Sequence, residues 1–107
     1  MQIIRDHGTV QTAAMEKIDS FLDKLMKRDF SGVKIKDPDK SWRGTTMTFS
    51  FRAKKGIVVA TIRGTVEVTA TQVILCAQLP ALVTTFVSEE MIRNVINSEF
   101  DKLFSIN

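Results

Sequence analysis

The residue types that most often carry chemistry are scarce in this sequence. His7 and Cys76 are its single histidine and its single cysteine, so a transition-metal site of the usual composition cannot be assembled from them. Asp6 adjoins His7, but neighbouring residues of a strand point to opposite faces, and a general base also needs a nucleophile or substrate within reach. We therefore predict no enzyme activity, no metal and no cofactor. We interpret His7 as a turn residue before a helix and Cys76 as a buried, inert thiol.

A second candidate for chemistry is the stretch 40–56, which holds the only tryptophan, Trp42, together with two phenylalanines and five basic residues. Basic strands with exposed rings are typical of RNA-binding sheets. However, Phe49 and Phe51 share the apolar face of an alternating pattern and Arg52 falls on the other, which favours core rings. The net charge is only +3, with basic residues spread along the chain, so no nucleic-acid partner is expected. We expect Trp42 to pack over the sheet end, with its indole N–H bonded to protein or water.

The periodicity of the apolar residues predicts the elements that must position these side chains. Strands are expected at 2–6, 33–36, 46–52, 57–69 and 72–79. Helices are expected at about 10–28 and 81–104, the second in two parts that meet near residue 88. Thr9 and Ser88 are the expected N-caps, and turns are expected at 37–40 and 54–56. The order is β-α-β-β-β-β-α, in which the four consecutive strands most simply form a meander.

Length and composition indicate one α+β domain spanning residues 1–107. A chain of this size buries roughly two thirds of its unfolded surface, and 44% apolar residues supply a core. Both amphipathic helices need an apolar surface, which one face of the sheet provides. Gly64, in the middle of a long strand, suggests a bend or bulge at which the sheet curls. We predict a curved antiparallel sheet packed on the long C-terminal helix, similar in outline to a reduced helix-grip fold.

The sequence shows no membrane or export signal. No apolar run approaches the roughly 18 residues of a membrane span, and residues 1–7 lack the apolar core of a signal peptide. A single cysteine fits a reducing compartment. We therefore expect a cytoplasmic protein without a transmembrane segment.

The segment 78–87, which joins the last strand to the last helix, is apolar on several sides and contains Leu79, Leu82 and Phe86. If exposed, it would form a hydrophobic patch for a partner, a lipid-like surface or a second copy of the chain. If buried, it would seat the helix on the sheet. We expect burial or self-association ahead of a lipid-facing role.

Several short motifs resemble a known family. They are Ile4–His7, Ser41–Ser50 with its Trp-x-Gly and Phe-Ser pairs, Gly64–Val68, and the Leu-Pro of Leu79–Leu82. Over nearly its whole length the chain resembles the putative polyhydroxyalkanoic acid system protein family, small bacterial proteins named from their association with polyester-storage genes or granules. The resemblance brings no catalytic residue that could be carried over to this sequence.

The resemblance implies a non-enzymatic accessory protein of the polyhydroxyalkanoate storage system, cytoplasmic and associated with polyester granules, that acts through an apolar surface. In that case the candidate contacts are Trp42, Leu79, Leu82 and Phe86. The alternative is a small hydrophobic-ligand-binding protein with a pocket between the sheet and the C-terminal helix. Helix-grip folds often enclose such a cavity, although a chain this short has little room for one. The candidate pocket residues are Phe49, Phe51, Ile62, Val66 and Ile96. A homodimer that buries the apolar segment is a further alternative.

Overall fold

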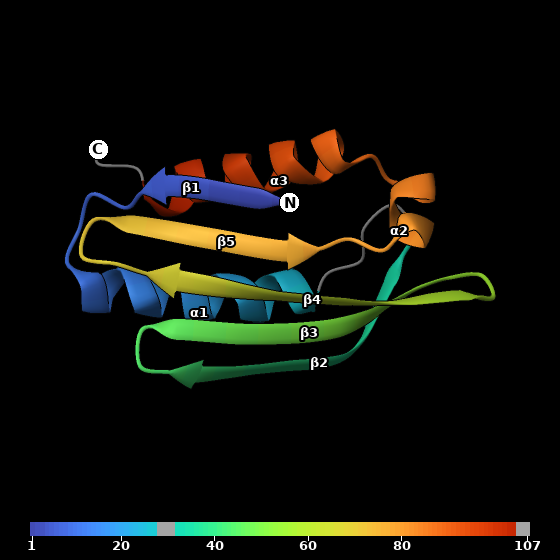
Figure 1. Ribbon diagram of the computed structural model, residues 1–107, viewed down its shortest axis with the longest axis horizontal. Coiled ribbons are helices and arrows are strands. Elements are labelled where there is room, and N and C mark those ends of the chain that lie inside the picture. Colours follow the sequence, from blue (N-terminus) through green and yellow to red (C-terminus); the bar gives the residue numbers. More distant parts are fainter. Residues whose placement is uncertain (28–31, 105–107) are drawn as a thin grey trace.

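The computed structural model describes residues 1–27 and 32–104, and it confirms the predicted order of the elements (Figure 1). The elements are β1 (Gln2–Asp6), α1 (Gln11–Met26), β2 (Lys34–Arg43), β3 (Thr46–Lys55), β4 (Val58–Val68), β5 (Gln72–Gln78), α2 (Ala81–Phe86) and α3 (Glu89–Leu103). The C-terminal helix is indeed divided in two. The prediction that the first helix reaches residue 28 extends beyond the described residues.

The five strands form one antiparallel sheet in the order β1-β5-β4-β3-β2. Strands β2 to β5 form the predicted meander. Strand β1 pairs with β5 and forms the edge of the sheet opposite β2. Figure 1 shows a curved sheet with α1 behind β3 and β4 and with α3 running along β1. The α+β class and the curved antiparallel sheet are therefore confirmed.

Strand β2 is longer than the sequence predicted, and the predicted turn at 37–40 is wrong. The pairing with β3 is interrupted only by a register shift between Lys36 and Asp39, where Asp37 adopts a positive φ of 52°. The strand then continues to Arg43. Pro38 lacks an N–H, which an edge strand tolerates at a bulge, so the chain kinks there without leaving the sheet.

Two-residue turns close the hairpins on either side of β3. Arg43 pairs with Thr46 and Lys55 pairs with Val58, so each loop contains two residues. The first residue of each loop is a glycine, Gly44 or Gly56, with φ of 62° or 63°. Glycine at this position is typical of the type II′ turns that match the twist of antiparallel strands.

The helices pack on one face of the sheet. From α1, the side chains of Ala14, Ile18, Phe21, Leu22 and Met26 are buried, and from α3 those of Ile96 and Phe100. The rings of Phe21 and Phe100 meet edge-on with centroids 5.4 Å apart, which joins the two helices. The opposing sheet residues are buried at alternating positions along β3, β4 and β5.

The two helix starts differ from each other. The Ser88 side chain accepts a hydrogen bond from the Met91 N–H, which confirms the predicted N-cap of α3. The predicted cap at Thr9 is wrong, because α1 begins one residue later and Val10 occupies the cap position without a side-chain bond. Val10 itself is 67% exposed.

Gly64 lies beneath an aromatic ring rather than in a bulge. The pairing of β4 with β3 and β5 runs without interruption through this residue. A Cβ atom built on Gly64 would lie 2.6 Å from Cζ of Phe49 and 2.5 Å from the carbonyl oxygen of Cys76. The glycine therefore provides the space in which the Phe49 ring lies flat against the sheet.

The helices cover only part of the sheet. Strand β4 has 11 residues and spans about 36 Å, whereas the 16 residues of α1 span about 24 Å. Met47, Val66 and Val68 are fully buried, but Ala53 and Ala60, farther along the hairpin of β3 and β4, are only half-buried. In Figure 1 this hairpin extends past the end of α1, on the side where α2 lies. The uncovered part of the apolar face forms the candidate site.

Candidate functional site

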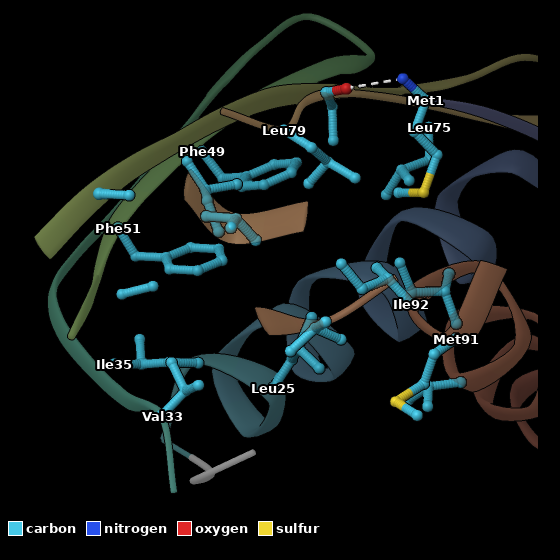
Figure 2. Close-up of a pocket in the computed structure, with 18 of the residues that line it drawn as sticks. Met1, Leu25, Val33, Ile35, Phe49, Phe51, Leu75, Leu79, Met91 and Ile92 are labelled. Carbon is cyan, nitrogen blue, oxygen red and sulfur yellow. Dashed lines mark hydrogen bonds between the residues drawn. The ribbon is translucent and has the colours of Figure 1, made fainter. Parts of the chain in front are cut away.

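An apolar pocket of about 200 Å³ lies between the uncovered part of the sheet and the helices (Figure 2). Its walls come from the three helices, from strands β2 to β5, and from Met1, which precedes β1. The lining side chains are those of Met1, Phe21, Leu22, Leu25, Val33, Ile35, Phe49, Phe51, Ala53, Lys55, Val58, Ala60, Ile62, Leu75, Ala77, Leu79, Leu82, Val83, Val87, Met91, Ile92, Val95 and Ile96. Among these described side chains, that of Lys55 is the only charged one.

The roof of the pocket is the concave face of β3 and β4. Phe49 and Phe51 are two residues apart on β3, so both point to this face, and their rings stack with centroids 6.3 Å apart and planes inclined by 14°. Ile62 pairs with Phe51 on β4 and points the same way. The buried Phe49 belongs to the closed core on one side and to the pocket on the other.

The floor and rim come from the helices and from the segment between β5 and α3. Leu25 lies in the last turn of α1, and Ile92, Val95 and Ile96 belong to α3. Leu82 and Met91 lie at the pocket and are each 53% exposed, so they form its rim. Figure 2 shows Leu79, Met91 and Ile92 pointing into the same space as the two phenylalanine rings.

Met1 closes the end of the pocket nearest β1. Its ammonium group donates a hydrogen bond to the carbonyl oxygen of Ala77 at 3.0 Å and lies 3.6 Å from a carboxylate oxygen of Glu89. The Ala77 N–H in turn donates to the Met1 carbonyl oxygen at 2.9 Å. These bonds extend the ladder of β1 and β5 and hold the Met1 side chain against Leu75 at the pocket wall (Figure 2).

Four of the five residues predicted for the pocket are found there. Phe49, Phe51, Ile62 and Ile96 all line the cavity. Val66 does not, because it lies on the part of the sheet that the helices cover and is fully buried there. The sequence missed Leu25, Ile35, Ala60 and the other residues at the open end. Their signal was the length of the predicted strands, which exceeds that of any helix able to cover them.

The predicted surface contacts do not form one group. Leu79 and Leu82 lie together at the pocket, and the segment 78–87 is partly exposed rather than buried. The side chain of Phe86 lies outside what the structure describes. Trp42 is not a pocket residue, and it lies near the end of β2 that points away from α2 (Figure 1).

Trp42 instead belongs to a polar cluster that joins β2 to α1. Its indole N–H donates to Oδ1 of Asp19 at 2.9 Å, and Nζ of Lys40 lies 2.8 Å from Asp19 and 2.7 Å from Asp23. Hydrogen bonds from Lys40 and Trp42 hold the pKa of Asp19 below its ordinary value of 3.8. Burial lowers the pKa of Lys40, but its hydrogen bonds to the two carboxylates raise it by more.

This cluster predicts an acid-dependent part of the stability. Because the pKa of Asp19 is lowered in the folded state, its stabilisation is fully present well above pH 3.8 and is lost as pH falls through the folded-state pKa. Asp19 is 40% exposed, so solvent screening limits the effect. We expect Asp19→Asn to lower the free energy of unfolding at pH 7 by less than about 1 kcal/mol.

Urea unfolding at pH 7 and at a series of lower pH values tests this prediction, since the difference between Asp19→Asn and the parent should shrink as the pH falls below 3.8. Asp23→Asn is the matched control, because it removes the other carboxylate near Lys40 but leaves the Trp42 bond intact. A difference that stays constant over the whole pH series would show that the Asp19 charge is not what stabilises the cluster.

The two residues first considered for catalysis lie away from the pocket. His7 is only 2% exposed, and its ring joins two turns: Nε2 lies 2.9 Å from the Thr69 carbonyl oxygen, and Nδ1 accepts the Thr9 N–H at 3.2 Å. Cys76 was expected to be fully buried, but it is only partly buried because it points with Ile74 to the outer face of the sheet. Within residues 1–27 and 32–104, no group of three His, Cys, Asp or Glu side chains could hold a metal ion.

Comparison with known proteins identifies the family of this chain. Over residues 1–104 the chain matches the model of a family described as putative polyhydroxyalkanoic acid system protein. No curated protein and no solved structure matches it significantly. None of the helices in the described part of the chain is long and apolar enough to cross a membrane. Since the match includes nearly every residue and confirms the resemblance of the motifs, the chain belongs to the putative polyhydroxyalkanoic acid system protein family.

Proposed function

We propose that the protein is a non-enzymatic accessory protein of the polyhydroxyalkanoate storage system that attaches to the polyester granule through its apolar pocket and rim. The observation that carries this proposal is the open pocket itself, whose described lining is apolar apart from Lys55. A pocket of this kind selects for apolar matter because each buried methylene contributes about 0.8 kcal/mol. Family membership supplies the setting.

The rim supports a role at an apolar surface. Leu82 and Met91 expose about half of their side chains beside the pocket, where they can enter an apolar phase without any change in the fold. Ile57, at the tip of the β3–β4 hairpin, is 98% exposed, and Lys54 and Lys55 flank the same tip. Large apolar side chains that remain exposed next to a pocket are typical of contact surfaces.

The non-enzymatic character is part of the proposal. It is supported by the position of the two residues best suited to catalysis, since both ring nitrogens of His7 bond to main-chain groups and Cys76 points to the other face of the sheet. Neither side chain lines the pocket.

Charges placed on the rim should prevent attachment. We expect the double variant Leu82→Asp/Met91→Asp to bind polyhydroxyalkanoate particles at least about tenfold more weakly in a pelleting assay, because each carboxylate must leave water to enter the polymer surface. The variant should fold normally. Both substitutions lie in the first turn of a helix, α2 or α3, where a negative charge is favourable.

Val10→Asp is the matched control, because Val10 is also an exposed apolar residue (67%) but does not line the pocket. It should pellet with the particles as the parent does. Equal binding by parent and double variant would contradict the proposal, and so would an equal loss in Val10→Asp. Light scattering of the same samples measures self-association, and a dimer of the parent that the rim charges dissociate would assign the rim to a second copy instead.

A further inference from the structure

The interior of the pocket offers a ligand almost nothing polar to bind. Apart from Lys55, the described lining side chains are aliphatic, aromatic or the thioethers of Met1 and Met91. The backbone groups of the roof pair along the ladders of β3, β4 and β5. Among the described residues, no buried side-chain nitrogen or oxygen lacks a hydrogen-bond partner. A polar group of a ligand would therefore lose its water without gaining a bond in return.

We infer that the pocket binds one unbranched alkyl chain of about eight carbons, inserted with its polar end outward. The length follows from the volume: a dry apolar cavity of about 150 Å³ holds the six carbons of benzene, so about 200 Å³ holds about eight. This inference rests on the proposed function, because it names the part of the storage polyester or its precursors that the site recognises.

The chemistry of a polyhydroxyalkanoate divides into two parts that the pocket treats differently. The main chain carries an ester group in every repeat, and its carbonyl oxygen would be buried without a donor. The side group of each repeat is a plain alkyl chain, which needs no partner. The alkyl tail of a free hydroxyalkanoic acid presents the same chemistry, so the ligand is an alkyl chain from either source.

The roof suits a straight chain. The stacked rings of Phe49 and Phe51 present flat surfaces to the pocket. Ala53 and Ala60 also line it, and their small side chains leave space between the rings and the open end of the pocket. Larger side chains at either alanine would obstruct this space. Ala60 and Thr61 are neighbours on β4 with opposite directions, so substitutions at the two positions form a matched pair.

Calorimetric titration of the full chain with the neutral series 1-butanol to 1-decanol tests the inference. Each added methylene should tighten binding about fourfold, and the gain should cease near eight carbons. Ala60→Trp should weaken 1-octanol binding at least about tenfold, whereas Thr61→Trp should leave it unchanged. Because Ala60→Trp could disturb folding, Ala53→Trp on β3 serves as a second blocking variant, and circular dichroism checks both.

Particles of two polyesters distinguish the sources of the chain. Poly(3-hydroxyoctanoate) carries pentyl side groups and poly(3-hydroxybutyrate) carries methyl groups. Stronger pelleting with the first assigns the chain to the polymer, and equal pelleting together with 1-octanol binding assigns it to free acids. The inference is overturned if affinity does not rise with chain length, or if both folded blocking variants bind 1-octanol like the parent.

The two proposals can fail separately. Particles that bind through the rim without any alkanol binding would leave the granule function and remove the alkyl site. Alkanol binding with no attachment to either particle would leave the alkyl site and remove the granule function.

Discussion

Replacing Gly64 by valine is expected to lower the free energy of unfolding by about 3 kcal/mol, because the site has no room for a side chain. Any Cβ atom here would lie 2.5 Å from the Cys76 carbonyl oxygen and 2.6 Å from the Phe49 ring. The carbonyl oxygen belongs to the backbone of β5 and cannot move without disturbing the ladder. Valine favours strands, so a loss of stability could not be ascribed to β-propensity.

Urea unfolding of Gly64→Val and of the control Thr65→Val measures this effect. Thr65 is the next residue on β4, is exposed and points to the outer face, so valine there should be nearly neutral. The second variant Gly64→Val/Phe49→Leu should recover part of the loss, because it removes the ring from one of the two close contacts. A midpoint of Gly64→Val equal to that of the parent would contradict the steric explanation.

The same substitution should alter the pocket. Phe49 lies over Gly64 and stacks on Phe51, so a side chain at position 64 pushes the first ring into the space that the second ring borders. Gly64→Ala, the milder change, is therefore expected to weaken 1-octanol binding as well as stability. The absence of a side chain at Gly64 lets the Phe49 ring pack against the sheet. Because this ring is part of the pocket roof, the packing at Gly64 also determines the shape of the candidate site.

The alternation of apolar and polar residues along β3 and β4 was enough to predict part of the pocket roof. Phe49, Phe51 and Ile62 fall on the apolar face by their spacing alone, and this spacing is local information. Val66 has the same phase as Ile62 but lies in the closed core. The difference depends on where the helices end above the sheet, which is tertiary information that no alternation contains.

The errors of prediction follow from the same limit. Strand β2 passes through Asp37 and Pro38 because its pairing with β3 outweighs the local preference of these residues for a turn. Trp42 donates a hydrogen bond to Asp19, which lies 23 residues earlier on α1. No local sequence pattern around either residue predicts this pairing. The burial of His7 likewise depends on a main-chain oxygen 62 residues away.

That burial leads to the second large effect: His7→Phe is expected to lower the free energy of unfolding by about 2–3 kcal/mol, although phenylalanine preserves a ring of similar size. Nε2 of His7 bonds to the Thr69 carbonyl oxygen and Nδ1 to the Thr9 N–H, so the ring joins the start of α1 to the β4–β5 turn. Phenylalanine leaves both main-chain groups without this partner, and buried polar groups that lack partners are costly.

His7→Ala is the companion variant and should cost more than His7→Phe, because it adds a cavity beside the Phe104 ring to the two lost bonds. His7→Gln, which keeps a donor for the Thr69 oxygen, should lie between the parent and His7→Phe. If His7→Phe proves as stable as the parent, the ring serves only as packing and the two bonds contribute nothing. Binding of 1-octanol should remain unchanged in every folded variant, because His7 does not line the pocket.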